Sequence, residues 1–426
     1  MYRRCGVCEV IMKVSLSTVL EKCIWLLTVL LFSCFLIFDG YAWGKYVFFG
    51  ASILILLMTA VIHDGMVRIR FDAFHGFFAA FIAYTALTSL WAIKASDATE
   101  KAITLVQIFA CAVLLFVHYD RKDNIRSLLT AVMWSGYVVT LYAIAVYGLD
   151  AMLQSTQDIR LQNEFANVNA VAMSAAVSCM LQWQELTQKR NRWSAVLMIP
   201  AVILITATQS RKAFILLLAG VVGIYIMRTA QQKGIARKIL KLCLYAIVGY
   251  VVMVLLFQLP IFEGSLARMQ NLLNFWSNEG KVDHSAILRD DMMQLGLDTF
   301  RQHPLAGVGI GSPHILAGQY LDFDSYLHNN FVELLCGGGI IGFVLYYAMY
   351  VYLFVGLFKY RKADSEAFYV ALIWLAMMLI MNYGMVTYYS KIQWYYLVIH
   401  FLNVNHLRKK HKEMTANEQN LAEEGV

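Results

Sequence analysis

Three groups of polar residues interrupt an apolar chain and together could bind an anion and activate a hydroxyl. Gln209-Ser210-Arg211-Lys212 is a tight turn between two apolar runs, Arg289 lies in Leu288-Arg289-Asp290-Asp291, and His328 opens His328-Asn329-Asn330-Phe331-Val332-Glu333. A guanidinium matches phosphate oxygens with paired hydrogen bonds, and a neutral imidazole can take a proton from a sugar hydroxyl. The functional interpretation of these residues is that Arg211 and Arg289 bind a phosphate group and that His328 acts as a general base.

Each of these residues also has a structural interpretation. Arg211 and Lys212 could lift their charges to lipid headgroups, and Arg289 could pair with the aspartates that follow it. His328, or an asparagine after it, could cap a helix. The weaker candidates for the same site are Lys212, Arg268, Arg301, Asn329 and Glu333.

Two other motifs do not lead to a cofactor or a metal. Gly307-Val308-Gly309-Ile310-Gly311 has no strand before it, so it is not a dinucleotide fingerprint and is expected to be a flexible turn. Asp322-Phe323-Asp324 has the DxD form that some glycosyltransferases use for a divalent cation, but three residues match by chance often. No zinc motif occurs in the sequence. We therefore predict no metal and no cofactor.

The composition is that of a membrane protein. Of 426 residues, 60% are hydrophobic and 15% are charged, whereas soluble domains are nearer half apolar and a quarter charged. Only four prolines occur, which suits long helices. The predicted fold class is therefore all-α, a polytopic integral membrane protein in which helices satisfy the backbone within the bilayer.

Apolar runs long enough to cross a bilayer recur about twelve times. They fall near 22–38, 45–62, 73–93, 102–118, 127–148, 165–182, 193–208, 212–227, 239–259, 331–357, 366–384 and 388–404. We expect a single membrane domain over 1–408 with one long loop over 260–330. Within that loop, ARMQNLLNFW and HSAILRDDMMQLGLDTF are expected to be helices. The polar tail 409–426 is expected to be disordered.

The basic residues orient these spans. Most of the 35 Lys and Arg residues cluster in alternate connections, which predicts that those connections and both termini are cytoplasmic and that the long loop lies outside. The net charge of +7 is explained by these clusters, so no nucleic-acid partner is expected. No small-residue cleavage site follows the basic N-terminus, which indicates a retained first span. None of the eight cysteines falls within the long loop, so no disulfide framework is predicted.

The order of these motifs resembles the O-antigen ligase and polymerase superfamily of bacterial envelope glycosyltransferases. The resemblance is carried by the cationic turn Ser210-Arg211-Lys212, by Arg289 in the long loop, and by three later blocks: Gly307-Val308-Gly309-Ile310-Gly311-Ser312, His328-Asn329-Asn330-Phe331-Val332-Glu333-Leu334-Leu335 and Gly338-Gly339-Ile340-Ile341-Gly342. It is strongest over 205–345. Phe165-Ala166-Asn167-Val168-Asn169 is similar to the family's asparagine-rich start of a span, with Val168 in place of a proline.

The resemblance implies a type C glycosyltransferase fold in the bacterial inner membrane. It further implies transfer of glycan from undecaprenyl diphosphate to an acceptor glycan that is either lipid-linked or a lipid A core, without a metal. The family's phosphate-binding arginines would correspond to Arg211 and Arg289, and its essential histidine to His328. The alternative is a flippase for lipid-linked oligosaccharide, which would be expected to carry charges inside its spans and to show repeated halves.

Overall fold

The structure is a computed structural model. It describes residues 6–41, 43–67, 69–122, 125–153, 167–189, 192–230 and 284–424, together with scattered positions between 234 and 270. Across these residues the regular structure is helical and no strand occurs, which confirms the all-α prediction. The helices are α1 (Gly6–Ile37), α2 (Gly44–Ile62), α3 (Ala73–Leu87), the 3₁₀ turn η1 (Thr88–Leu90), α4 (Ala95–Lys122), α5 (Ile125–Tyr147), α6 (Leu149–Leu153), α7 (Val168–Lys189), α8 (Arg192–Ala207), α9 (Arg211–Ala230), α12 (His284–Gln302), α13 (Pro313–Leu321), α14 (Asn330–Tyr360), α15 (Ser365–Gly384) and α16 (Lys391–Glu424).

The predicted spans fall on these helices, except for 239–259, which lies largely outside the described residues. Within the described part of the chain, eight helices are long and apolar enough to cross a membrane, and α8 is apolar but shorter. The polytopic membrane class is therefore confirmed, and the number twelve stays a prediction. Of the two expected loop helices, the second is α12, and the first, 267–276, lies almost entirely outside the described residues.

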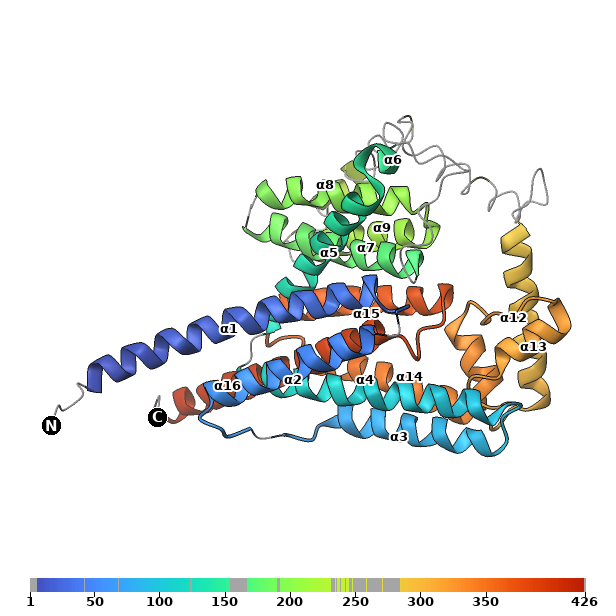
Figure 1. Cartoon of the computed structure of the whole chain (residues 1–426). Helices are drawn as coiled ribbons and strands as arrows, with labels where there is room; N and C mark the ends of the chain where they lie inside the picture. Colours follow the sequence, from blue (N-terminus) through green and yellow to red (C-terminus); the bar gives the residue numbers. More distant parts are fainter. Residues whose placement is uncertain are drawn as a thin grey trace.

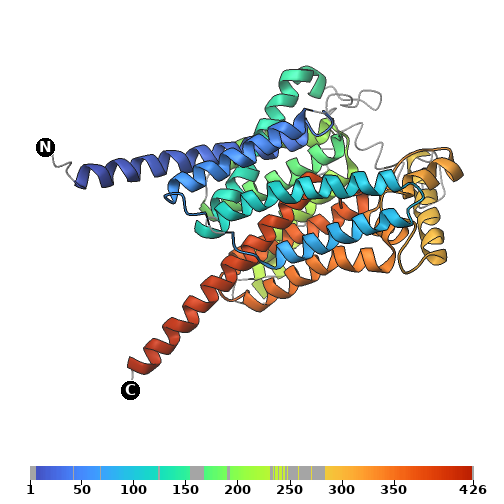
Figure 2. The same cartoon turned by 60° about the horizontal axis from the view of Figure 1, so that its bottom comes forward.

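Most of the long helices run roughly parallel, so the bundle has two distinct ends (Figure 1). The end that carries α12 and α13 is called the cap end. The beginning of α1 and the end of α16 lie at the opposite end, called the terminal end, in both Figure 1 and Figure 2.

The helices pack through a large apolar core with many aromatic side chains. α7 packs against α5, α8 and α9, and α9 packs against α15. Near the centre of the bundle, Phe78 of α3 stacks on Trp394 of α16, with ring centroids 3.5 Å apart. At the start of α15, Asp364 accepts the backbone N–H of Ala367 and so caps the helix.

The glycine-rich segment after α12 is not a flexible turn, contrary to expectation. Gly307 and Gly309 are buried. The N–H of Val308 donates to the carbonyl of Cys336 at 3.0 Å, and the N–H of Gly309 donates to that of Gly337 at 2.8 Å. A Cβ on Gly307 would come within 2.5 Å of α14 backbone atoms, and the φ of Gly307 is +65°. The glycines therefore let the loop hydrogen-bond directly to the α14 backbone.

α14 is broken where that loop joins it. Gly339 has φ 60° and ψ −166°, outside the helical region. The backbone N–H groups of Ile340 and Ile341 then donate to the carbonyls of Pro304 and Leu305. The break thus exposes backbone groups of α14 that the cap end uses for attachment.

The tail beyond residue 408 is helical, not disordered as predicted. α16 continues to Glu424 without interruption. The segment KKHKEMTANEQNLAEE contains neither glycine nor proline and consists mostly of good helix formers. Extending a packed helix requires no new nucleation, so a polar sequence can remain helical there.

Candidate active site

His328 lies at the cap end, in the short connection between α13 and α14. Its backbone is left-handed, with φ 57°, a conformation uncommon for residues other than glycine. On one side, Asn329 caps α14 by accepting the N–H groups of Phe331 and Val332. On the other side, the N–H of Leu327 donates to the Glu333 carboxylate at 2.8 Å. The predicted base is therefore held on a strained turn that both neighbouring residues fix in place.

The imidazole of His328 is partly buried among cations and an aromatic ring. The ring of Tyr326 lies against it, with centroids 4.3 Å apart. Burial and the positive charges of Arg289 and Lys212 lower the pKa of His328 to about 4. The imidazole is thus neutral at physiological pH and has an unprotonated nitrogen.

Arg289 reaches this region from α12, which packs on α14. The two helices share a small apolar cluster of Met292, Ala317, Leu327, Val332 and Cys336. Gly296 permits the close approach, since a Cβ there would lie 2.5 Å from Val332 and 2.6 Å from Leu327. The half-buried Arg289 also lowers the pKa of Tyr326, although burial raises the pKa of that phenol overall.

Lys212 and Arg211 begin α9, and both are half-buried. The Lys212 ammonium donates to the carbonyl of Gly384, the last residue of α15. Just before them, Gln209 has a left-handed φ of 52° and is buried together with Ser210. Lys212, a weaker candidate from the sequence, is thus the member of this turn that interacts electrostatically with His328. Arg211 occupies the adjacent position at the same helix start.

The other sequence candidates have different surroundings. Arg301 is 73% exposed at the far end of α12 and pairs with Asp298. Arg268 lies outside the described residues. Asn329 is a helix cap, whereas Asn330 accepts the N–H groups of Thr387 and Tyr388 and so ties α14 to the connection between α15 and α16.

Glu333 is buried below His328 and has a cationic neighbour that sequence reasoning missed. Its carboxylate interacts electrostatically with Lys101 of α4. The Lys101 ammonium lies 3.8 Å from the centroid of the Tyr389 ring. A lysine directly at the edge of the apolar run 102–118 is a signal that could have identified it.

Tyr326 was also missed from the sequence. In addition to its contact with His328, its hydroxyl is hydrogen-bonded to the side chain of Asn167. Asn167 in turn accepts the N–H groups of Asn169 and Ala170 at the start of α7. Residues from α7, α9, α12 and the start of α14 are therefore linked around the imidazole.

The DxD residues form a separate arrangement. Asp322 has a left-handed backbone and ends α13. Asp324 accepts from one ring nitrogen of His314 at 2.6 Å, and Asp97 of α4 lies 2.9 Å from the other. These two carboxylates raise the pKa of His314 despite its partial burial. His314 therefore joins α13 to α4.

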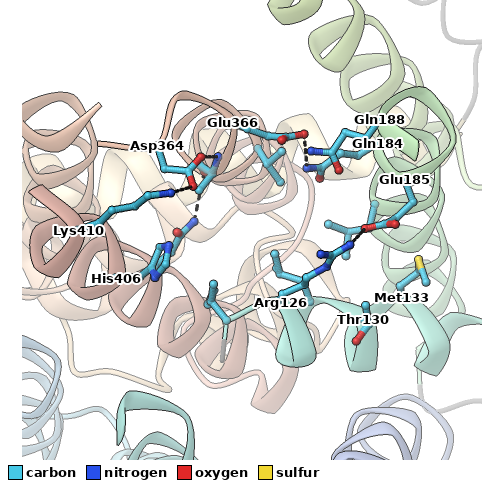
Figure 3. Close-up of a pocket in the computed structure, with 16 residues that line it drawn as sticks. Arg126, Thr130, Met133, Gln184, Glu185, Gln188, Asp364, Glu366, His406 and Lys410 are labelled. Atoms are coloured by element: carbon cyan, nitrogen blue, oxygen red, sulfur yellow. Dashed lines mark hydrogen bonds and ion pairs between the residues drawn. The ribbon is translucent and has the colours of Figure 1, made fainter. Parts of the chain in front are cut away.

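A cavity of about 640 Å³ lies at the terminal end, away from His328 (Figure 3). Arg126 pairs with Glu185, and Lys410 pairs with Asp364 at 2.7 Å. Among the described residues that line this cavity there is no Phe, Trp or Tyr. Its charges are largely paired with one another, so it does not offer the unbalanced positive charge that surrounds His328.

One comparison with known proteins matches a part of the chain that contains several residues of this cluster. No curated protein sequence matches the chain. A protein-family model described as O-antigen ligase matches residues 193–347, a segment that contains Arg211, Arg289 and His328. The family comprises membrane proteins of glycosyltransferase type in polysaccharide synthesis, whose substrates are lipid-linked oligosaccharides and acceptor glycans. This match over residues 193–347, together with the helical membrane fold, supports the resemblance to the O-antigen ligase and polymerase superfamily of the bacterial inner membrane.

Proposed function

We propose that the protein transfers a glycan from undecaprenyl diphosphate to a sugar hydroxyl of an acceptor glycan, with inversion and without a metal. The observation that carries the proposal is that Arg289 and Lys212 both act electrostatically on His328 at one end of the bundle. Cations beside a neutral base are what transfer from a diphosphate to a hydroxyl requires.

In this mechanism the diphosphate lies among Arg289, Lys212 and Arg211. The acceptor oxygen attacks the anomeric carbon from the face opposite the diphosphate, so the new bond has inverted configuration. The bond between that carbon and the phosphate oxygen breaks, and its electron pair remains on the lipid diphosphate. The cations stabilise this charge in place of a protonating acid. His328 takes the proton of the attacking hydroxyl.

Binding of the donor would itself strengthen the base. In the free site, burial and the two cations lower the pKa of His328 to about 4. A bound diphosphate brings negative charge beside the same cations and so raises that pKa. The imidazole therefore becomes basic when the leaving group is present, which disfavours unproductive proton uptake in the empty site.

The cap end is assigned to the outer face of the membrane. Basic residues such as Arg228 in the last turn of α9 and Arg361 directly after α14 lie near helix ends at the terminal end, as the positive-inside rule expects for the cytoplasm. The donor would then be used on the face where nucleotide sugars are absent and a lipid-linked donor is required. The acceptor is another lipid-linked glycan or a lipid A core.

The test is a transfer assay with purified full-length protein in nanodiscs and undecaprenyl diphosphate-linked oligosaccharide, with and without EDTA. We expect transfer to survive EDTA and to fall by about 10²-fold or more in His328→Ala. His411→Ala is the matched control, because His411 is exposed in the tail of α16. Full activity of His328→Ala would refute the assigned base, and loss of activity with EDTA would refute metal independence.

A further inference from the structure

A second cleft at the cap end, separate from the His328 cluster, has the chemistry of a saccharide site. It has a volume of about 590 Å³ and lies between the end of α12, α13 and the turn after η1. Trp91 and Tyr320 contribute aromatic rings to it, and Asp298, Gln302 and His303 contribute polar groups. The geometry points to this cleft as the binding site for a sugar chain of the substrate, more than one sugar away from the reacting bond.

The two aromatic side chains of the cleft are accessible to a ligand. Tyr320 is 71% exposed and Trp91 is 38% exposed. A sugar ring presents a face of C–H bonds and an edge of hydroxyls. Trp and Tyr offer a flat apolar surface together with a polar tip, which suits the face. A carboxylate, an amide and an imidazole can accept from and donate to hydroxyls at the edge.

The walls of the cleft are fixed before any ligand binds. The indole N–H of Trp91 donates to the carbonyl of Ala306 at 3.3 Å, and the N–H of Ile93 donates to the carbonyl of Val308 at 3.2 Å. Val308 is in turn hydrogen-bonded to Cys336 of α14. Binding would thus order few additional groups, which favours affinity for a weakly binding ligand such as a sugar.

Residues that line the cleft also pack against the apolar cluster beneath the His328 turn. Its floor includes Leu295 and Leu316, which pack against the cluster that contains Leu327. Asp298 follows Arg289 by nine positions on α12, or about 13 Å along the helix axis. A chain bound at the reacting centre would need to extend by more than one sugar to reach the cleft. Sugars bound there would contribute remote binding energy to the reaction.

The terminal-end cavity lacks these features. It has about the same volume, but no Phe, Trp or Tyr lines it among the described residues, and its charges form ion pairs. The cap-end cleft is therefore distinguished from this cavity by its exposed aromatic faces and planar polar groups, and not by its size.

The experiment measures sugar binding separately from transfer. Full-length His328→Ala protein in nanodiscs is titrated with the delipidated oligosaccharide released by mild acid from the host's own lipid-linked repeat units. We expect binding by calorimetry or saturation-transfer NMR, and a loss of at least tenfold in affinity when Tyr320→Ala or Gln302→Ala is added. Tyr320→Phe keeps the ring and should retain binding. Gln294→Ala, also exposed on α12 but outside the cleft, is the matched control.

The inference rests on the proposed function for the identity of the ligand, and the two can fail separately. Unchanged affinity in both Tyr320→Ala and Gln302→Ala would overturn the cleft assignment even if wild-type protein transfers glycan. Tyr320-dependent sugar binding would uphold it even if His328 proved dispensable. In the transfer assay, a raised KM for the acceptor alone would identify the bound chain as the acceptor's, and a raised KM for the donor alone as the donor's.

Discussion

Glu333 accepts the backbone N–H of Leu327 at 2.8 Å, and this hydrogen bond closes the turn that presents His328. Both residues are buried, and the bond spans the left-handed residue itself. The carboxylate is therefore a positioning group for the proposed base.

Replacement of Glu333 should separate this positioning role from its charge. Glu333→Ala leaves the Leu327 N–H without an acceptor, at a cost of about 1–3 kcal/mol in unfolding free energy. Glu333→Gln keeps a carbonyl acceptor and should retain more stability and more transfer activity. Thermal unfolding and transfer rates of the two variants provide the check. Equal loss in both would show that the charge beside Lys101, and not the hydrogen bond, is what matters.

The pH dependence of transfer should differ between the free and donor-bound protein. The pKa of His328 is about 4 in the free site, so kcat/KM should fall only as the pH drops through about 4 and the imidazole becomes protonated. A bound diphosphate raises that pKa, so kcat should begin to fall at a higher pH. Rate profiles from pH 3.5 to 8 measure both. An acid limb of kcat at or below that of kcat/KM would contradict donor-induced basicity.

Removal of Arg289 should affect both donor binding and the base. Arg289→Gln removes a cation that lowers the pKa of His328, so the acid limb of kcat/KM should move to higher pH. The loss of a charge-assisted contact with the diphosphate should also reduce kcat/KM by about tenfold or more. Arg301→Gln serves as control, since Arg301 is 73% exposed at the other end of α12. An unchanged pH profile in Arg289→Gln would show that Arg289 does not lower the pKa of His328.

The attachment of α13 to α4 should weaken in alkali. The two carboxylates hold the pKa of His314 above its ordinary value, so the link is complete below pH 6.5 and is lost as the pH rises through the raised pKa. Neutral imidazole has a single N–H and can donate to only one of Asp97 and Asp324. Hydrogen exchange of peptides covering α13, corrected for intrinsic rates, should show less protection at pH 8.5 than at pH 6.

The same measurement on His314→Gln provides the control. An amide does not titrate in this range, so the difference between the two pH values should disappear. The α16 peptides, which contain His411, should behave alike in both proteins. Persistence of the pH effect on α13 in His314→Gln would exclude His314 as its origin.

The local properties of the sequence determined the fold class and most helix positions. The high apolar content predicted a membrane protein, and the apolar runs placed helices such as α5 and α15 to within a few residues. The block that begins at His328 and the arginines before it supplied the candidate site, and the match over 193–347 contains Arg211, Arg289 and His328. These features are read along the chain, because hydropathy and motif spacing depend only on neighbouring residues.

The tertiary structure alone decided which of these residues meet. Lys212 acts on His328, Lys101 interacts with Glu333, and the N–H groups of Val308 and Gly309 donate to the α14 backbone, because segments far apart in sequence pack side by side. Composition gave a wrong prediction for the tail after residue 408. This segment is polar, yet it is helical because it continues a packed helix. The polarity of a segment indicates whether it is buried, but it does not indicate which other segments pack against it.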